Sequence, residues 1–61
     1  MLWWTLRQLR SRYAYVRLQA VEKLNSLGDP GAIEPLIVVL ADEGPAVRKA
    51  AAEALHKIDP E

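Results

Sequence analysis

The sequence contains no cysteine and no phenylalanine, and its only histidine is His56. Without cysteine the chain can form neither a disulfide framework nor a thiolate metal site. A single histidine does not make a zinc site unless several carboxylates converge on the same point. We therefore expect that the chain holds no metal and no cofactor.

The sequence also lacks a motif that indicates catalysis. Ser11 and Ser26 fall at expected helix ends, where capping of the backbone explains a serine. The turn at residues 28–31 contains two glycines but has neither the lysine nor the spacing of a phosphate-binding loop. We therefore expect no catalytic residue, and we predict that the chain is not an enzyme.

No apolar run is long enough to cross a bilayer. The longest run extends from Leu36 to Ala41, whereas a membrane-spanning helix needs about 20 apolar residues. The opening Leu2-Trp3-Trp4 is followed at once by polar residues and does not resemble a signal peptide. We expect a cytoplasmic location and no membrane partner.

The formal net charge is zero, but the charges are unevenly distributed: residues 1–17 carry +4 and residues 18–61 carry −4. A basic first helix with nearby tyrosines can bind phosphates and stack on bases. A solvated helix face explains the same arginines, and the pI of 6.6 is far below the value of about 9 that is typical of nucleic-acid-binding domains. We do not expect a nucleic-acid partner, and weak nucleic-acid binding is kept as an alternative. The residues concerned are Arg7, Arg10, Arg17, Tyr13 and Tyr15.

Nine alanines and nine leucines in 61 residues indicate helices around a core of small side chains. Breaks at residues 28–31, at Gly44-Pro45 and around residues 11–14 divide the chain into four segments, each predicted to be a helix of about 10 to 14 residues. The expected core stripes are Leu2, Leu6 and Leu9; Val16, Ala20, Leu24 and Leu27; Ile33, Leu36, Ile37 and Leu40; and Val47, Ala50, Ala51, Ala54, Leu55 and Ile58.

The chain contains an internal repeat with a shift of 31 residues. Two copies of one helix hairpin explain this self-similarity. We predict an all-α single domain, 1–61, with a divergent first repeat at 2–27, a second repeat at 28–58 and a tail at 59–61. The identical pairs under the shift are Leu9 and Leu40, Val16 and Val47, Arg17 and Arg48, Ala20 and Ala51, Glu22 and Glu53, and Leu24 and Leu55.

Residues 28–58 resemble a HEAT-like repeat of the phycobilisome-lyase type. The first copy matches mainly through Val16-Arg17, and it departs from the pattern with Trp4, Ser11 and Gln19 in place of a proline, an aspartate and an alanine. The segments that carry the resemblance are Gly28-Asp29-Pro30-Gly31-Ala32-Ile33-Glu34-Pro35-Leu36-Ile37, Leu40-Ala41-Asp42, Val47-Arg48 and Ala50 to Leu55.

The resemblance implies two antiparallel helix hairpins stacked as a short HEAT-like α-solenoid. It also implies a structural ladder of ion pairs formed by Arg17, Asp42 and Arg48. Because Ser11 stands where the first aspartate is expected, Arg17 should pair with Asp42, and Arg48 needs an acid from a third repeat or another chain. Members of the family are mostly interaction surfaces, and the alternative is part of a bilin lyase or isomerase subunit.

Large apolar residues at positions expected to face solvent indicate a protein partner. Under the repeat shift Trp3 corresponds to Glu34, and Val38 and Val39 correspond to polar residues of the first repeat. The competing interpretation is that Trp3 or Trp4 folds back as a cap over the first hairpin. The second helices, 14–27 and 45–58, should form a concave surface. Its polar candidates are Gln19, Glu22, Lys23, Asn25, Lys49, Glu53 and His56.

Two repeats without an obvious polar cap leave both ends of the stack open. We therefore predict a non-catalytic scaffold that mediates protein–protein interaction or self-association, as a homo-oligomer or with adjacent HEAT-like repeats. The expected protein-binding residues are Trp3, Trp4, Val38, Val39, Gln19, Lys23, Lys49 and Glu53.

Overall fold

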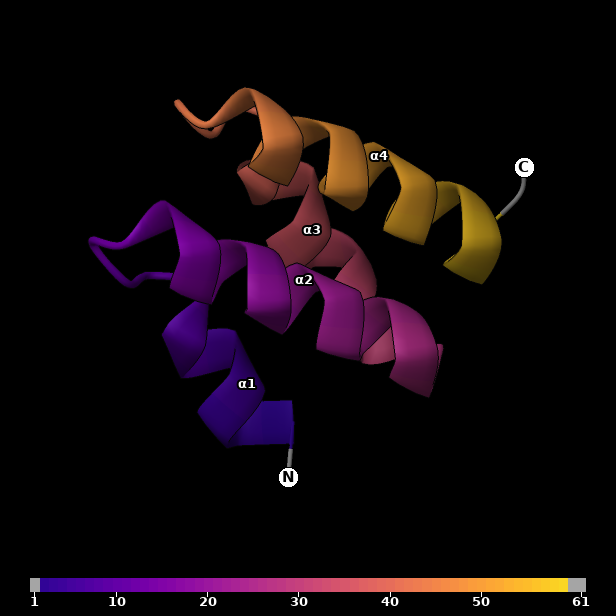
Figure 1. The fold of residues 1–61 in the computed structure, drawn as a ribbon. Helices are drawn as coiled ribbons and strands as arrows, with labels where there is room; N and C mark the ends of the chain where they lie inside the picture. Colours follow the sequence, from indigo (N-terminus) through magenta and orange to yellow (C-terminus); the bar gives the residue numbers. More distant parts are fainter. Residues whose placement is uncertain (1, 60–61) are drawn as a thin grey trace.

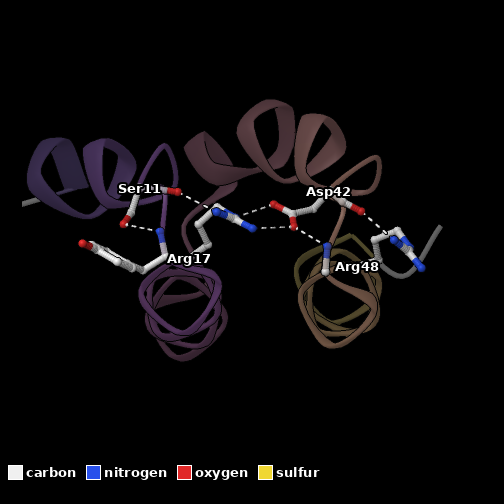
Figure 2. A network of polar contacts seen from close by, with 6 residues as sticks. Ser11, Arg17, Asp42 and Arg48 are labelled. Carbon is white, nitrogen blue, oxygen red and sulfur yellow. Dashed lines mark hydrogen bonds and ion pairs between the residues drawn. The ribbon is translucent and has the colours of Figure 1, made fainter.

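The computed structural model describes residues 2–59, with the backbone alone at Leu2; of the expected tail, only Asp59 lies within this range. Figure 1 shows α2 and α4 side by side, and Figure 2, viewed along these two helices, shows α1 and α3 forming a second layer. The predicted all-α fold of two stacked hairpins is confirmed. The elements are α1 (Leu2–Gln8), α2 (Ala14–Leu27), the 3-10 turn η1 (Pro30–Ala32), α3 (Ile33–Val39) and α4 (Pro45–Ile58).

The helices α1 and α3 are shorter than predicted, with seven residues each. After α1 the backbone hydrogen bonds reach three residues back instead of four, as in the bond from the N–H of Leu9 to the carbonyl of Leu6. At the start of α3, Pro30 begins a separate 3-10 turn, and Pro35 falls in the first helical turn, where its missing N–H costs nothing. None of the helices in the described range is both long and apolar enough to span a membrane.

Glycine and proline set the ends of the two long helices. Gly28 has φ of 64° and donates its N–H to the carbonyl of Leu24, which ends α2 in the left-handed conformation that glycine adopts freely. The side chain of Asp29 then accepts a 2.8 Å hydrogen bond from the N–H of Gly31. At the other break, Pro45 occupies the first position of α4, as expected from the sequence.

Small residues let α2 and α4 approach closely, and the two helices form the most extensive contact between elements. Ala20, Ala51 and Ala54 are at most 1% exposed. Two polar side chains, Thr5 and Arg17, are buried as well, although the sequence pattern did not indicate it. The buried apolar core consists of Leu9, Ala20, Val21, Leu24, Ala32, Leu36, Val39, Val47, Ala51 and Ala54.

The predicted apolar stripe of α3 is wrong at three positions. Val39 was expected to be exposed, but it is only 6% exposed and forms one stripe with Ala32 and Leu36. Ile37 and Leu40 were expected in the core and are exposed. The helix is therefore rotated so that residues four and three apart, 32, 36 and 39, face inward. In α2, Leu27 is likewise exposed and Val21 takes a core position.

Candidate functional site

A row of polar contacts crosses the loops at one end of the two hairpins (Figure 2). Arg17 donates from Nε to Oδ2 of Asp42 at 2.7 Å and from Nη2 to Oδ1 at 3.1 Å. Its Nη1 donates to the backbone carbonyl of Ser11 at 2.6 Å. The two charged side chains are only 10% and 11% exposed. The ion pair that the resemblance implies between Arg17 and Asp42 is therefore present, and it joins the first hairpin to the second.

Asp42 is held by partners from both hairpins. Besides Arg17, its Oδ1 accepts a 2.8 Å hydrogen bond from the N–H of Gly44. Burial acts to raise the pKa of Asp42, but the hydrogen bonds from Arg17 and Gly44 and the positive charges of Arg17 and Arg48 outweigh it. The pKa of Asp42 therefore lies below its ordinary value, and the carboxylate is ionised at neutral pH.

The same loop contacts occur in both hairpins. Arg48 donates from Nη1 to the backbone carbonyl of Asp42 at 2.7 Å, as Arg17 does to the equivalent Ser11. The hydroxyl of Ser11 accepts from the N–H of Tyr13 at 3.1 Å, as Asp42 does from the equivalent Gly44. Ser11 therefore caps its turn in the same way as Asp42 does, but it carries no charge. The sequence did not indicate that the carbonyls of Ser11 and Asp42 are acceptors, although the 31-residue shift pairs Ser11 with Asp42 and Arg17 with Arg48.

Several large apolar side chains remain exposed on the layer formed by α1 and α3. Trp3, Trp4 and Val38 are 62%, 53% and 74% exposed, so neither tryptophan is buried as a cap over the first hairpin. The two indole rings tilt against each other with centroids 6.2 Å apart. A groove of about 440 Å³ separates α1 from α3, with the buried Val39 in its lining. The lining residues of this outer groove are Leu6, Leu9, Arg10, Pro35, Val38 and Val39.

The remaining candidates from the sequence lie on the surface of α2 and α4. Gln19, Lys23, Lys49 and Glu53 are all exposed. The tyrosines considered for nucleic-acid stacking, Tyr13 and Tyr15, are exposed and lie against each other with ring centroids 5.9 Å apart.

The structure also bears on two further candidate sites, phosphate binding at Arg17 and metal binding at His56. Arg17 was a candidate for phosphate binding, but its guanidinium is occupied by Asp42 and Ser11. His56 lies exposed on α4. Over residues 2–59, histidine and acidic side chains do not form a group of three or more that is able to hold a metal ion.

Comparison with known proteins agrees with this geometry. A search of the curated proteins finds no match to the chain. The family model described as HEAT repeats matches residues 4–61, which include nearly all of both hairpins together with Arg17, Asp42 and Arg48. The chain therefore belongs to the family of HEAT repeats.

Proposed function

We propose that this HEAT-repeat chain is a non-catalytic scaffold that mediates protein–protein contact through the outer groove between α1 and α3. The observation that supports this function is the exposure of Trp3 and Val38 beside one apolar groove. Contiguous exposed apolar groups on a small chain mark a binding surface. Tryptophan and arginine, both present here, are the residue types that contribute most to protein interfaces.

A second copy of the same chain is the partner that we propose for this groove. A chain of about 60 residues buries only about 60% of the surface that its unfolded form exposes, so its stability is marginal. Association that covers Trp3 and Val38 stabilises the folded state without requiring another protein. Most homo-oligomers are two-fold dimers in which the same patch meets itself.

Sedimentation over a hundredfold dilution series tests this proposal. We expect a dimer or larger assembly at micromolar concentration, and a melting temperature that rises with protein concentration. Trp3→Ser combined with Val38→Asp should shift the chain to monomer while leaving the helical circular dichroism unchanged. Tyr15→Ser is the matched control, because Tyr15 is 64% exposed but lies on α2 and not in the groove. A monomer throughout the series would overturn the proposed self-association.

The other functions suggested by the sequence have less support. A role in a bilin lyase or isomerase subunit rests on the resemblance of residues 28–58 alone, and a chromophore-attachment assay with a partner subunit tests it. Nucleic-acid binding through Arg7 and Arg10 would show affinity that falls steeply with salt. The exposed apolar groove favours the protein scaffold over both.

A further inference from the structure

The first hairpin carries a second pocket, apart from the outer groove. It has a volume of about 520 Å³, and we call it the arginine pocket. Its polar residues have no polar match in the second hairpin, where the 31-residue shift places two valines and an alanine opposite Arg7, Gln8 and Arg10. The pocket has thus gained two positive charges. Its lining residues are Trp4, Arg7, Gln8, Arg10, Ser11 and Val16.

The backbone after α1 aligns the two arginines. The N–H of Arg10 donates to the carbonyl of Arg7 at 3.1 Å, and the N–H of Ser11 donates to the carbonyl of Gln8 at 3.0 Å. Hydrogen bonds of this span bring side chains three residues apart onto the same side of the chain. The pocket therefore presents Arg7 and Arg10 as one row, with the amide of Gln8 and the hydroxyl of Ser11 as a second row.

No acid within residues 2–59 neutralises these arginines. The ion pair in this range joins Arg17 to Asp42, while Arg7 and Arg10 are exposed and free of such a contact. Ser11, which corresponds to Asp42, leaves the lining of the pocket without negative charge. Charge complementarity therefore favours a ligand that carries carboxylates.

The pocket also has an apolar wall. Trp4 is 53% exposed, and Val16, from α2, is half-buried. Tryptophan and arginine side by side are the residue types that contribute most to protein interfaces. A ligand that carries only charge would leave Trp4 uncovered, so the fitting ligand combines carboxylates with an apolar side chain.

We propose that the arginine pocket binds a short acidic peptide segment of another protein. An aliphatic or aromatic side chain of the segment lies against Trp4, and neighbouring carboxylates pair with Arg7 and Arg10. The amide of Gln8 can both donate to and accept from the backbone of the segment. The arginine pocket shares only Arg10 with the outer groove, and the proposal does not rest on the function assigned to that groove.

A short peptide fits this pocket better than a strand of nucleic acid does. A strand carries a negative charge on every phosphate, and residues 18–61, which carry −4, repel it. Nucleic-acid-binding domains present an extended basic patch, whereas two arginines line this pocket. The exposed Tyr13 and Tyr15, which would stack on bases, are not among its lining residues.

Fluorescence anisotropy with a designed peptide tests the proposal. The probe is a fluorescein-labelled peptide in which one leucine is flanked by two glutamates on each side. We expect saturable binding to the whole chain, with a Kd below about 1 mM. The same peptide with glutamines in place of the glutamates should bind at least about tenfold more weakly, because its charge-assisted contacts are lost.

Variants of the pocket locate the binding. Arg7→Gln and Trp4→Ser should each weaken binding about tenfold. Ser11→Asp should weaken it as well, because it places a carboxylate in the pocket, and Asp42 shows that an aspartate caps this kind of turn. Arg12→Gln is the matched control, because Arg12 is exposed and does not line the pocket.

Three results would overturn the proposal. They are the absence of saturable binding, equal losses for Arg7→Gln and Arg12→Gln, and tighter binding of a fluorescein-labelled oligothymidylate than of the peptide at the same salt concentration. Equal losses would mean that charge attracts the peptide without a defined site. Helical circular dichroism checks that each variant is folded. If Trp4→Ser lowers the helicity, Arg7→Gln and Ser11→Asp decide by the same criteria.

Discussion

Arg17 donates two hydrogen bonds, 2.7 Å and 3.1 Å long, to the carboxylate of Asp42, and so connects residues that are 25 apart in the sequence. Both side chains are nearly buried, so solvent screens their attraction much less than it screens a surface ion pair. Because Arg17 also holds the carbonyl of Ser11, one guanidinium fixes the loop of the first hairpin against the loop of the second. Arg17 therefore adds a polar link between the loops to the packing of α2 on α4 that joins the two hairpins.

Asp42→Ala should lower the free energy of unfolding by about 1–3 kcal/mol, because it leaves the buried Arg17 guanidinium without its carboxylate. Arg17→Ala should cost a similar amount, and the double variant should cost less than the sum of the two. Urea denaturation of the four proteins measures this coupling. Glu43→Ala is the control at the neighbouring exposed acid and should change stability by less than about 0.5 kcal/mol. Simple additivity would mean that the pair does not form in solution.

The stabilising effect of Asp42 should depend on pH. Its pKa in the folded state lies below the ordinary value, since hydrogen bonds and positive charge outweigh the effect of burial. The unfolded chain therefore binds the proton more readily, and the contribution is fully present above the ordinary aspartate pKa of about 3.9. It is lost as the pH falls through the folded-state pKa.

Comparison of the wild-type chain with Asp42→Asn isolates this effect from the other acids. The difference in unfolding free energy should be constant between about pH 6 and pH 8 and should shrink below about pH 5. Denaturant melts at a series of pH values measure it. A difference that stays the same down to pH 2 would show that the Asp42 carboxylate is not the source of the stability.

Much of the architecture was predictable because its signals are local. Gly28 and Pro45 mark helix ends by their own conformational properties, and the 31-residue repeat indicates two similar hairpins before any contact is known. The contact of Arg17 with Asp42 was predicted from the family pattern. The backbone carbonyls of Ser11 and Asp42 were not, because every residue carries one and the sequence does not distinguish the acceptor that a side chain will reach.

The rotation of α3 was not predictable from periodicity. Its sequence from Ile33 to Leu40 has only Glu34 and Pro35 to interrupt apolar residues, so two stripes fit the helical period equally well. Packing against α4 and the rest of the core selects Leu36 and Val39. The remaining apolar residues of α3 then face outward, and Val38 among them lines the outer groove that we assign to binding.

Close packing of α2 on α4 should make the buried alanines intolerant of larger side chains. Ala51→Leu and Ala54→Leu should each cost about 1–3 kcal/mol by overpacking, since both alanines are fully buried. Ala46→Leu is the matched control, because Ala46 lies in the same helix and is exposed. Thermal melts that are unchanged for Ala54→Leu would show that this side of α4 does not face α2.

Val38 and Val39 are adjacent valines with opposite environments, 74% and 6% exposed, and they provide the sharpest test of how α3 sits. Val39→Ala should lower the free energy of unfolding by about 1.5–3 kcal/mol, because it removes two buried methyl groups that pack in the core. Val38→Ala makes the same chemical change at the surface and should cost less than about 0.5 kcal/mol. Urea denaturation of the two variants compares them directly. Equal losses, or a larger loss at Val38, would mean that α3 presents the stripe of Ile33, Ile37 and Leu40 to the core.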